Sequence, residues 1–207
     1  MAESRELRLW QACTDGGLET VMELARDPAV DFNWVGEDRG DTSLHRARFE
    51  WLEIVKLLLA QKKIEVNKGN KGDASPFYIS CQEGHKEVVS RLLADPRIDP
   101  SKPNINEATP FYIACQNGHK EVVSLLLADP RIDPNKPDKN EATPFFMASQ
   151  SGHKEVVSLL LADPRIDPKK RRDTGATPFS IACENGHKEV VSLLLADSRI
   201  DPQPAEE

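Results

Sequence analysis

The strongest constraint on this 207-residue chain is a period of 34 residues. The tripeptide Thr-Pro-Phe starts at Thr109, Thr143 and Thr177, and the variant Ser-Pro-Phe starts 34 residues earlier, at Ser75. A glycine followed by a histidine recurs at the same interval, and the histidines are His85, His119, His153 and His187. A fixed period between about 20 and 50 residues is typical of repeat arrays, in which each repeat packs mainly on its neighbours.

One period, residues 107–140, begins with the signals of a short helix. Thr109 suits the position before the first helical residue, and Pro110 suits the first turn because its missing N–H has no partner to lose there. Gly118 suits the end of this helix, where a left-handed backbone is common. The apolar face follows the spacing i, i+3, i+4 and consists of Phe111, Ala114 and Cys115.

A second helix is predicted over residues 120–128, with Glu121 and Ser124 facing solvent. Its buried stripe consists of Val122, Val123, Leu126 and Leu127. Pro130 ends it, since a residue before proline is pushed away from helical conformation. Residues 131–142 are rich in Pro, Asn, Lys and Asp and are predicted to form a long loop. Neither helix buries its apolar face alone, so stacked copies must shield one another in an all-α array.

Charge and hydropathy exclude several classes of function. The net charge of -7 and the pI near 5.4 argue against a nucleic-acid partner. No apolar run approaches the roughly 18 residues needed to span a bilayer, so no membrane association is expected. Residues 1–10 alternate charged and apolar side chains and contain no signal-peptide core. An intracellular, cytoplasmic protein is therefore expected.

The four cysteines occupy one position of the repeat and are Cys13, Cys81, Cys115 and Cys183. Stacked helices lie roughly 8 to 10 Å apart, too far for Cα atoms that a disulfide must bring within about 7 Å. No pair has the C-x-x-C spacing of a metal site. They are interpreted as small buried hydrophobic residues, and reduced thiols agree with an intracellular setting.

The segment Thr109–His119 reads TPFYIACQNGH, and Thr42–Ala47 reads TSLHRA. Both are similar to the family pattern T-P-L-H-x-A-A-x-x-G-H, so the chain resembles an ankyrin-repeat protein over nearly its whole length. The resemblance implies a solenoid of helix-turn-helix repeats whose long loops form β-hairpin-like fingers. It also implies a non-catalytic domain without cofactor or metal.

Six repeats are expected within a single domain of residues 1–207, with boundaries near 4–38, 39–72, 73–106, 107–140, 141–174 and 175–207. The first is degenerate and suits an N-terminal cap with a solvated face. The last repeats the internal apolar stripe and lacks a polar cap. It is expected to belong to a longer array, to allow end-to-end self-association, or to fray, and the first of these is favoured.

Two departures from the family pattern are expected to change local structure. The sequence Asp-Pro-Arg-Ile-Asp follows the second helix from Asp95, Asp129 and Asp163, and this accounts for 34 residues rather than 33. The second repeat is one residue short, and Glu50 aligns with Gly118. A non-glycine residue at positive φ costs roughly 1 kcal/mol. A shortened first helix or distorted turn is predicted there, together with the weakest interface between repeats.

No motif of an enzyme occurs, and a catalytic residue is needed once rather than in every repeat. Histidines spaced by about 10 Å along a stack cannot share a metal ion. By resemblance, the histidine after each glycine bonds the neighbouring repeat's backbone, and a threonine hydroxyl holds His45. Trp34 and Trp51 are interpreted as core residues.

The segment 169–172, Lys-Lys-Arg-Arg, is the one cluster of positive charge. Three interpretations stay open: a solvated loop, a contact for an acidic partner, and a nuclear-localisation or nucleic-acid contact. The acidic character of the rest of the chain disfavours the third.

The resemblance places an unidentified partner protein or peptide in a concave groove lined by fingers and first helices. Carried over position by position, the partner-binding candidates are Lys71, Gln82, Glu83, Ile105, Gln116, Asn117, Lys139, Gln150, Ser151, Arg171, Arg172, Glu184 and Asn185. The expected function is therefore a protein–protein interaction module or scaffold. The alternative is the targeting segment of a larger enzyme or effector whose catalytic part is absent from this chain.

Overall fold

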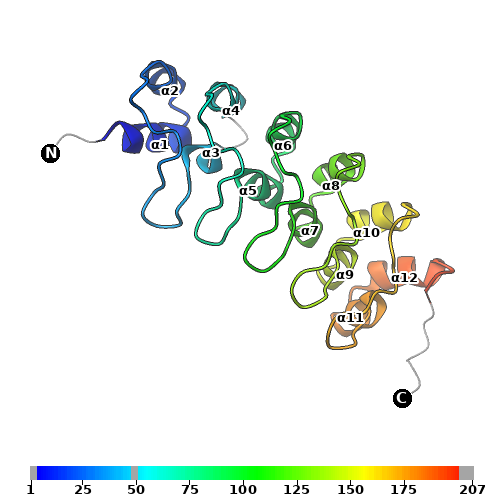
Figure 1. Ribbon diagram of the computed structural model, residues 1–207. Coiled ribbons are helices and arrows are strands. Elements are labelled where there is room, and N and C mark those ends of the chain that lie inside the picture. The colour runs from blue at the N-terminus through cyan, green and yellow to red at the C-terminus, as the bar shows by residue number, and fades with distance from the viewer. Residues whose placement is uncertain (1–3, 48–50, 201–207) are drawn as a thin grey trace. The chain divides into compact units, whose positions relative to one another are not determined.

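The computed structural model describes residues 4–47 and 51–200. The chain divides into two compact parts, Met1–Ile105 and Asn106–Glu207. Within the described residues each part consists of three helix pairs joined by loops (Figure 1). Within the described residues every regular element is a helix, which confirms the all-α fold class.

The N-terminal part contains three helix pairs. They are α1 (Arg5–Asp15) and α2 (Leu18–Leu24), α3 (Ser43–Arg46) and α4 (Leu52–Leu59), and α5 (Pro76–Glu83) and α6 (Lys86–Leu93). First helices α1, α3 and α5 pack in one row, and second helices α2, α4 and α6 pack in another. The long loops extend beyond the row of first helices (Figure 1).

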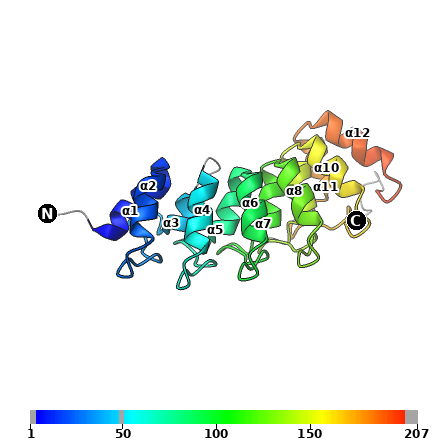
Figure 2. The same cartoon turned by 90° about the horizontal axis from the view of Figure 1, so that it is seen from above.

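The C-terminal part repeats this plan more regularly. Its helices are α7 (Pro110–Gln116) and α8 (Lys120–Leu127), α9 (Pro144–Gln150) and α10 (Lys154–Leu161), and α11 (Pro178–Glu184) and α12 (Lys188–Ala196). α9 packs between α7 and α11, and α10 packs between α8 and α12. Two layers of helices result, with loops on the side of the first helices (Figure 2).

The predicted helix signals form as expected. The Thr109 hydroxyl oxygen accepts a hydrogen bond from the Tyr112 N–H at 3.1 Å, and Pro110 occupies the first turn. Gly118 follows with φ of 77°, in the left-handed region. The cores between helices contain the predicted stripe: Val122, Val123 and Leu126 are buried, whereas Leu127 is only half-buried.

Each finger, meaning the long loop between a second helix and the next first helix, is a closed turn rather than a two-stranded ladder. In the C-terminal part the Asp138 N–H donates to the Ala142 carbonyl at 2.9 Å. Val35 and Thr42 form the isolated antiparallel bridge of the first finger. The hairpin-like loops implied by the resemblance thus form without strands in the described segments, because turns at Pro and Asx residues interrupt the pairing.

The second repeat has the predicted short first helix, since α3 spans four residues. Glu50, on which the prediction of a distorted turn rested, lies outside the described residues. Trp51 immediately precedes α4, the position that histidine occupies before α6, α8, α10 and α12. Its indole lies against Gly16, where a Cβ would come within 2.2 Å of the ring. Trp51 therefore packs against the first repeat, but Trp51 and Trp34 are half-buried rather than the core residues that the sequence predicted.

The Asp-Pro-Arg sequence of the inserted turn links successive repeats. Asp163 accepts hydrogen bonds from the Arg165 N–H at 2.9 Å and from its guanidinium at 2.7 Å. The same guanidinium donates to the Leu127 carbonyl, 38 residues earlier, at 2.8 Å. We name this arrangement the Asp-Pro-Arg staple. An equivalent staple joins Arg97 to the Leu59 carbonyl, and Arg199 reaches the Leu161 carbonyl in the same way from a turn that has Ser198 in place of proline.

Three acidic residues with left-handed backbone mark the fingers at intervals of 34 residues. They are Asp73, Glu107 and Glu141, with φ of 55°, 62° and 58°. The equivalent residue of the last finger is Gly175, with φ of 82°. An L-residue with a side chain pays roughly 1 kcal/mol for this conformation, whereas glycine adopts it freely.

The substitution Glu107→Gly should therefore stabilise the chain. Relief of the left-handed strain exceeds the entropy cost of glycine, and we expect a gain of about 0.5 kcal/mol in the free energy of unfolding by urea titration. As a control, Glu121→Gly in the helical first turn of α8 should lower stability instead. Destabilisation by both changes would contradict the strain argument.

The substitution Asp163→Asn should reduce stability in a pH-dependent way. Hydrogen bonds from Arg165 lower the pKa of Asp163 below its ordinary value. The unfolded state therefore binds more protons in acid, so this stabilisation is present above the unfolded pKa near 3.9 and is lost as pH falls through the lower folded pKa.

At pH 7 the variant should lose about 0.5 kcal/mol, and the difference from wild type should vanish near pH 2 in urea titrations. Glu155→Gln, at an exposed carboxylate on α10, should change little at either pH. A difference that persisted unchanged in acid would show that the carboxylate charge contributes nothing.

Candidate functional site

Backbone hydrogen bonds join the tips of successive fingers. In the N-terminal part, the Lys71 N–H donates to the Arg39 carbonyl at 3.0 Å and the Ile105 N–H to the Gly72 carbonyl at 2.9 Å. In the C-terminal part, the Lys139 N–H donates to the Asn106 carbonyl at 3.1 Å. These three candidates from the sequence thus occupy one equivalent position, and their backbones are held by the preceding finger.

The side chains at this position differ in what they offer a partner. Lys71 donates its ammonium group to the Glu37 and Asp38 carbonyls of the first finger. Lys139 donates to the Asn106 side-chain oxygen at 2.8 Å. Ile105 is 69% exposed, the largest exposure among the big hydrophobic side chains described. The lysines brace the fingers, and Ile105 remains available for contact.

Eight further candidates lie at the ends of the first helices, while Arg171 and Arg172 belong to the basic cluster of the last finger. Gln116 is half-buried and Asn117 is exposed at the end of α7, and the same pattern holds for Gln150 and Ser151 after α9. In the other repeats the equivalent pairs are Gln82 with Glu83 and Glu184 with Asn185, and of these only Gln82 is half-buried. The Asn185 side chain donates to the Gln150 carbonyl at 2.9 Å, so it also links two repeats.

An apolar residue that the sequence reasoning missed lies beside each pair. Ile113 precedes Gln116 and Asn117 by three and four residues, so the three share one helix face. Equivalent to Ile113 are Ile79, Met147 and Ile181, and all four are half-exposed. The i, i+3, i+4 spacing was visible in the sequence, but the resemblance directed attention to polar positions alone.

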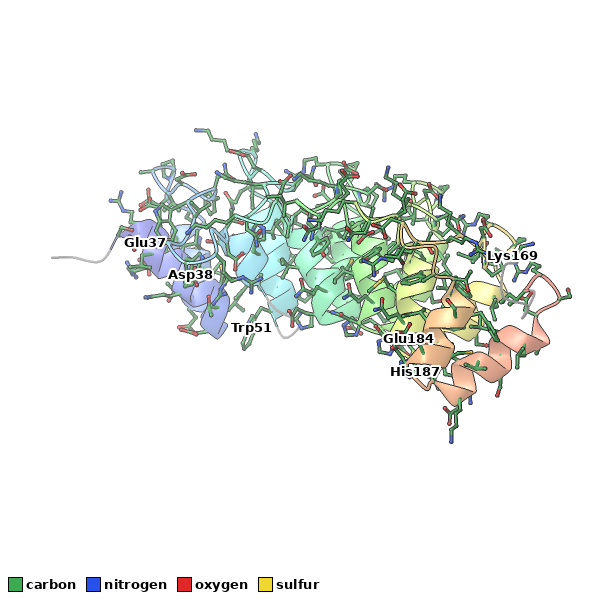
Figure 3. All side chains as sticks on the ribbon, turned by 90° about the horizontal axis from the view of Figure 1, so that it is seen from below. Glu37, Asp38, Trp51, Lys169, Glu184 and His187 are labelled. Carbon is green, nitrogen blue, oxygen red and sulfur yellow. The ribbon has the colours of Figure 1, made fainter. Side chains whose placement is uncertain are left out.

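The basic cluster is largely occupied by contacts within the chain. Lys170 forms an ion pair with Glu141 at 3.2 Å, and Arg172 pairs with Asp173 at the same distance. Arg171 donates to the Gly175 carbonyl at 3.0 Å. Lys169 is exposed (Figure 3). These contacts favour the interpretation of a braced, solvated loop.

The repeated histidines have the structural role that the resemblance implied. The ring nitrogen Nε2 of His153 lies 2.8 Å from the Gln116 carbonyl, and that of His187 lies 2.8 Å from the Gln150 carbonyl. Each ring also covers the glycine of the preceding repeat: a Cβ on Gly118 would lie 2.5 Å from the His153 ring. The glycine of one repeat and the histidine of the next repeat therefore form a single contact.

His45 is held as predicted. Its Nδ1 lies 2.8 Å from the Thr42 hydroxyl and accepts the Thr42 N–H at 3.0 Å, while Nε2 donates to the Ala74 carbonyl at 2.8 Å. These partners fit the neutral imidazole protonated on Nε2. Burial lowers the pKa of His45, which keeps the ring neutral.

The cysteines are unpaired and differ in burial. Cys13, Cys81 and Cys115 are buried, and burial raises the pKa of Cys13 to about 12 and of the other two well above the ordinary range. Cys183 is exposed, which corrects the expectation of four buried thiols. The equivalent Ser149 is fully buried, because a following repeat covers it.

Neither a metal site nor a membrane-spanning helix is apparent in the part of the chain that the structure describes. No three histidine, cysteine, aspartate or glutamate side chains gather there in a way that could hold an ion. No helix within residues 4–47 and 51–200 combines the length and apolar character needed to cross a bilayer.

Comparison with known proteins agrees with this geometry. A family model described as ankyrin repeats, in three copies, matches residues 50–138, 77–172 and 130–205, which together cover most of the chain. No curated protein matches. Among solved structures, the crystal structure of EF0377, an ankyrin-repeat protein, aligns with a TM-score of 0.81 over 95% of this chain and 99% of its own, at 24% sequence identity. The structural likeness supports the fold, the family model covers well over half of the sequence, and the chain belongs to the ankyrin-repeat family.

Proposed function

We propose that this chain is a non-catalytic interaction module that binds a partner protein or peptide on its finger face. The finger face comprises the finger tips and the half-exposed surface of the first helices. Ankyrin repeats are generally protein-interaction modules. The proposal treats the two compact parts as separate surfaces of the same kind.

The observation that carries the proposal is the repeated triplet on the first helices. In the C-terminal part, one half-exposed apolar side chain precedes two polar ones in each triplet, which are Ile113-Gln116-Asn117, Met147-Gln150-Ser151 and Ile181-Glu184-Asn185. Such a surface offers apolar burial together with amide hydrogen bonds. It suits an extended or helical peptide with apolar and polar side chains in alternation.

The other exposed surfaces lack this combination of apolar and amide side chains. The outer faces of α8 and α10 carry Ser124, Ser158 and charged residues and lack such a triplet. Within the basic cluster Lys170 and Arg172 are already paired within the chain, so this cluster has few free cations to offer an acidic partner. The few large anchors on the finger face favour modest affinity, since Trp, Tyr and Arg dominate strong interfaces.

A charge-matched pair of variants tests this assignment. Ile113→Lys with Met147→Lys places two ammonium groups on the finger face of the C-terminal part. Ser124→Lys with Ser158→Lys places the same charges on the exposed second helices α8 and α10. Partners captured from a cell lysate by the immobilised wild-type chain would be identified by mass spectrometry and then measured by calorimetry.

The finger-face variant should lose at least about tenfold in affinity, equivalent to about 1.4 kcal/mol, while the second-helix variant should bind within about twofold of wild type. Circular dichroism would establish that both variants fold. Equal binding by both folded variants, or loss confined to the second-helix variant, would refute the finger face as the binding surface.

A further inference from the structure

The second helices of the first two repeats carry apolar side chains at positions that are polar in the other repeats. α2 and α4 begin with Leu18 and Leu52, and the fifth residue of α2 is Met22. The exposed fraction is 37% for Leu18 and 39% for Met22, and Leu52 is half-buried. The second helices of the other four repeats begin with exposed lysines, which are Lys86, Lys120, Lys154 and Lys188.

The exposure of these positions does not depend on what precedes or follows a repeat. α10 packs between α8 and α12, so it has a neighbour on each side. Its first and fifth residues, Lys154 and Ser158, are nevertheless exposed. The two positions therefore point away from adjacent repeats, and Leu18 and Met22 occupy the same positions on α2.

Trp51 joins the apolar residues of α2 and α4. Its indole lies against Gly16, two residues before Leu18, and Leu52 follows it in the chain. The indole is half-buried and projects at the edge of the helix layers (Figure 3). α2 packs on α4, and Met22 shares a helix face with Leu18. We name Leu18, Met22, Trp51 and Leu52 the α2–α4 patch.

The surroundings of the patch are acidic where α2 begins. Asp15 and Glu19, three residues before and one residue after the start of α2, are exposed, and neither forms an ion pair within the described residues. On α4 the charges of Glu53 and Lys56 are paired at 2.6 Å. Arg26, the next cation along the chain, lies past the far end of α2. Two unpaired carboxylates therefore lie beside an exposed apolar cluster.

We infer that the α2–α4 patch binds a cationic amphipathic helix of a partner protein. The apolar stripe of that helix covers Leu18, Met22 and Trp51, and a lysine or arginine at the edge of the stripe lies beside Asp15 and Glu19. Tryptophan is one of the residue types that contribute most to binding at interfaces. The patch is formed by helices and has no strand edge, so an extended peptide has no hydrogen-bond ladder to join there.

This surface differs from the finger face in position and chemistry. The patch lies on second helices, whereas the finger face comprises finger tips and first helices. The two proposals are therefore independent, and either stands if the other fails. Anionic lipid is a poor occupant, because Asp15 and Glu19 would repel its headgroups.

A synthetic helix serves as the probe for the full chain. It has about 18 residues, or five turns, with leucine on one face and lysine on the other, and it carries a fluorescent label. A matched peptide has glutamate in place of each lysine. Fluorescence anisotropy gives the affinity of each peptide for the wild-type chain, and the lysine helix should bind at least about tenfold more tightly than the glutamate helix.

Two pairs of variants separate the patch from other apolar surface. Leu18→Ser with Met22→Ser should weaken binding of the lysine helix at least about tenfold, since it removes apolar area without changing charge. Ile113→Ser with Met147→Ser removes two apolar side chains from the finger face and should change the affinity less than about twofold. Circular dichroism checks that each variant folds. If the first does not fold, Leu18→Lys with Met22→Ser, the residues of α8, replaces it.

A second pair separates the local carboxylates from net charge. Asp15→Asn with Glu19→Gln should weaken binding at least about threefold and reduce its dependence on salt. Glu121→Gln with Glu155→Gln removes the same charge from α8 and α10 and should leave the affinity within about twofold of wild type.

Three results would overturn the inference. One is equal binding of the lysine helix by wild type and by the folded Leu18→Ser, Met22→Ser variant. Another is an equal loss from both pairs of charge variants, which would reduce the attraction to net charge. The third is a wild-type dimer in sedimentation velocity that the Leu18→Ser, Met22→Ser variant dissociates, because a second copy would then occupy the patch.

Discussion

The architecture of the C-terminal part depends on one contact, the histidine ring of a repeat placed over the glycine of the repeat before it. The left-handed glycine ends the first helix and leaves helical carbonyls without internal donors. In the C-terminal part His153 and His187 supply the missing donor and cover Gly118 and Gly152. A side chain on the glycine would occupy the space of the ring, so the two residue types must occur together. Trp51 over Gly16 shows that an aromatic ring can fill this space where histidine is absent.

The Asp-Pro-Arg staple reinforces the same boundary from the second layer of helices. Its arginine is oriented by an aspartate two residues away and therefore loses little freedom when it reaches the preceding repeat. Asparagine side chains add a third link: Asn135 donates to the Arg165 carbonyl and accepts from the Asp167 N–H. Polar side chains thus define the register between repeats, while the apolar stripe supplies the burial.

The same links shape what the surface offers to a partner. Lysines of the fingers are used to brace neighbouring fingers, and much of the basic cluster is paired internally. Some basic side chains that appear free in the sequence are therefore bonded to other residues of the chain. The half-exposed Ile113 and Met147 beside amide side chains, and the α2–α4 patch of the N-terminal part, are surfaces that internal contacts leave available.

By itself the sequence determined the repeat, its two helices and the positions of its core, because a fixed period with Thr-Pro at the start and glycine at the turn admits one local structure. Thr109, Pro110 and Gly118 act as the pattern predicted. Apart from the histidines, whose contacts the resemblance implied, only the tertiary structure decided which side chains reach across repeats. The staple from Arg165 to Leu127 joins residues 38 positions apart, and no local rule of helix or turn formation specifies such a contact. The exposure of Cys183 likewise depended on whether a neighbour covers it, which a property shared by all four cysteines could not reveal.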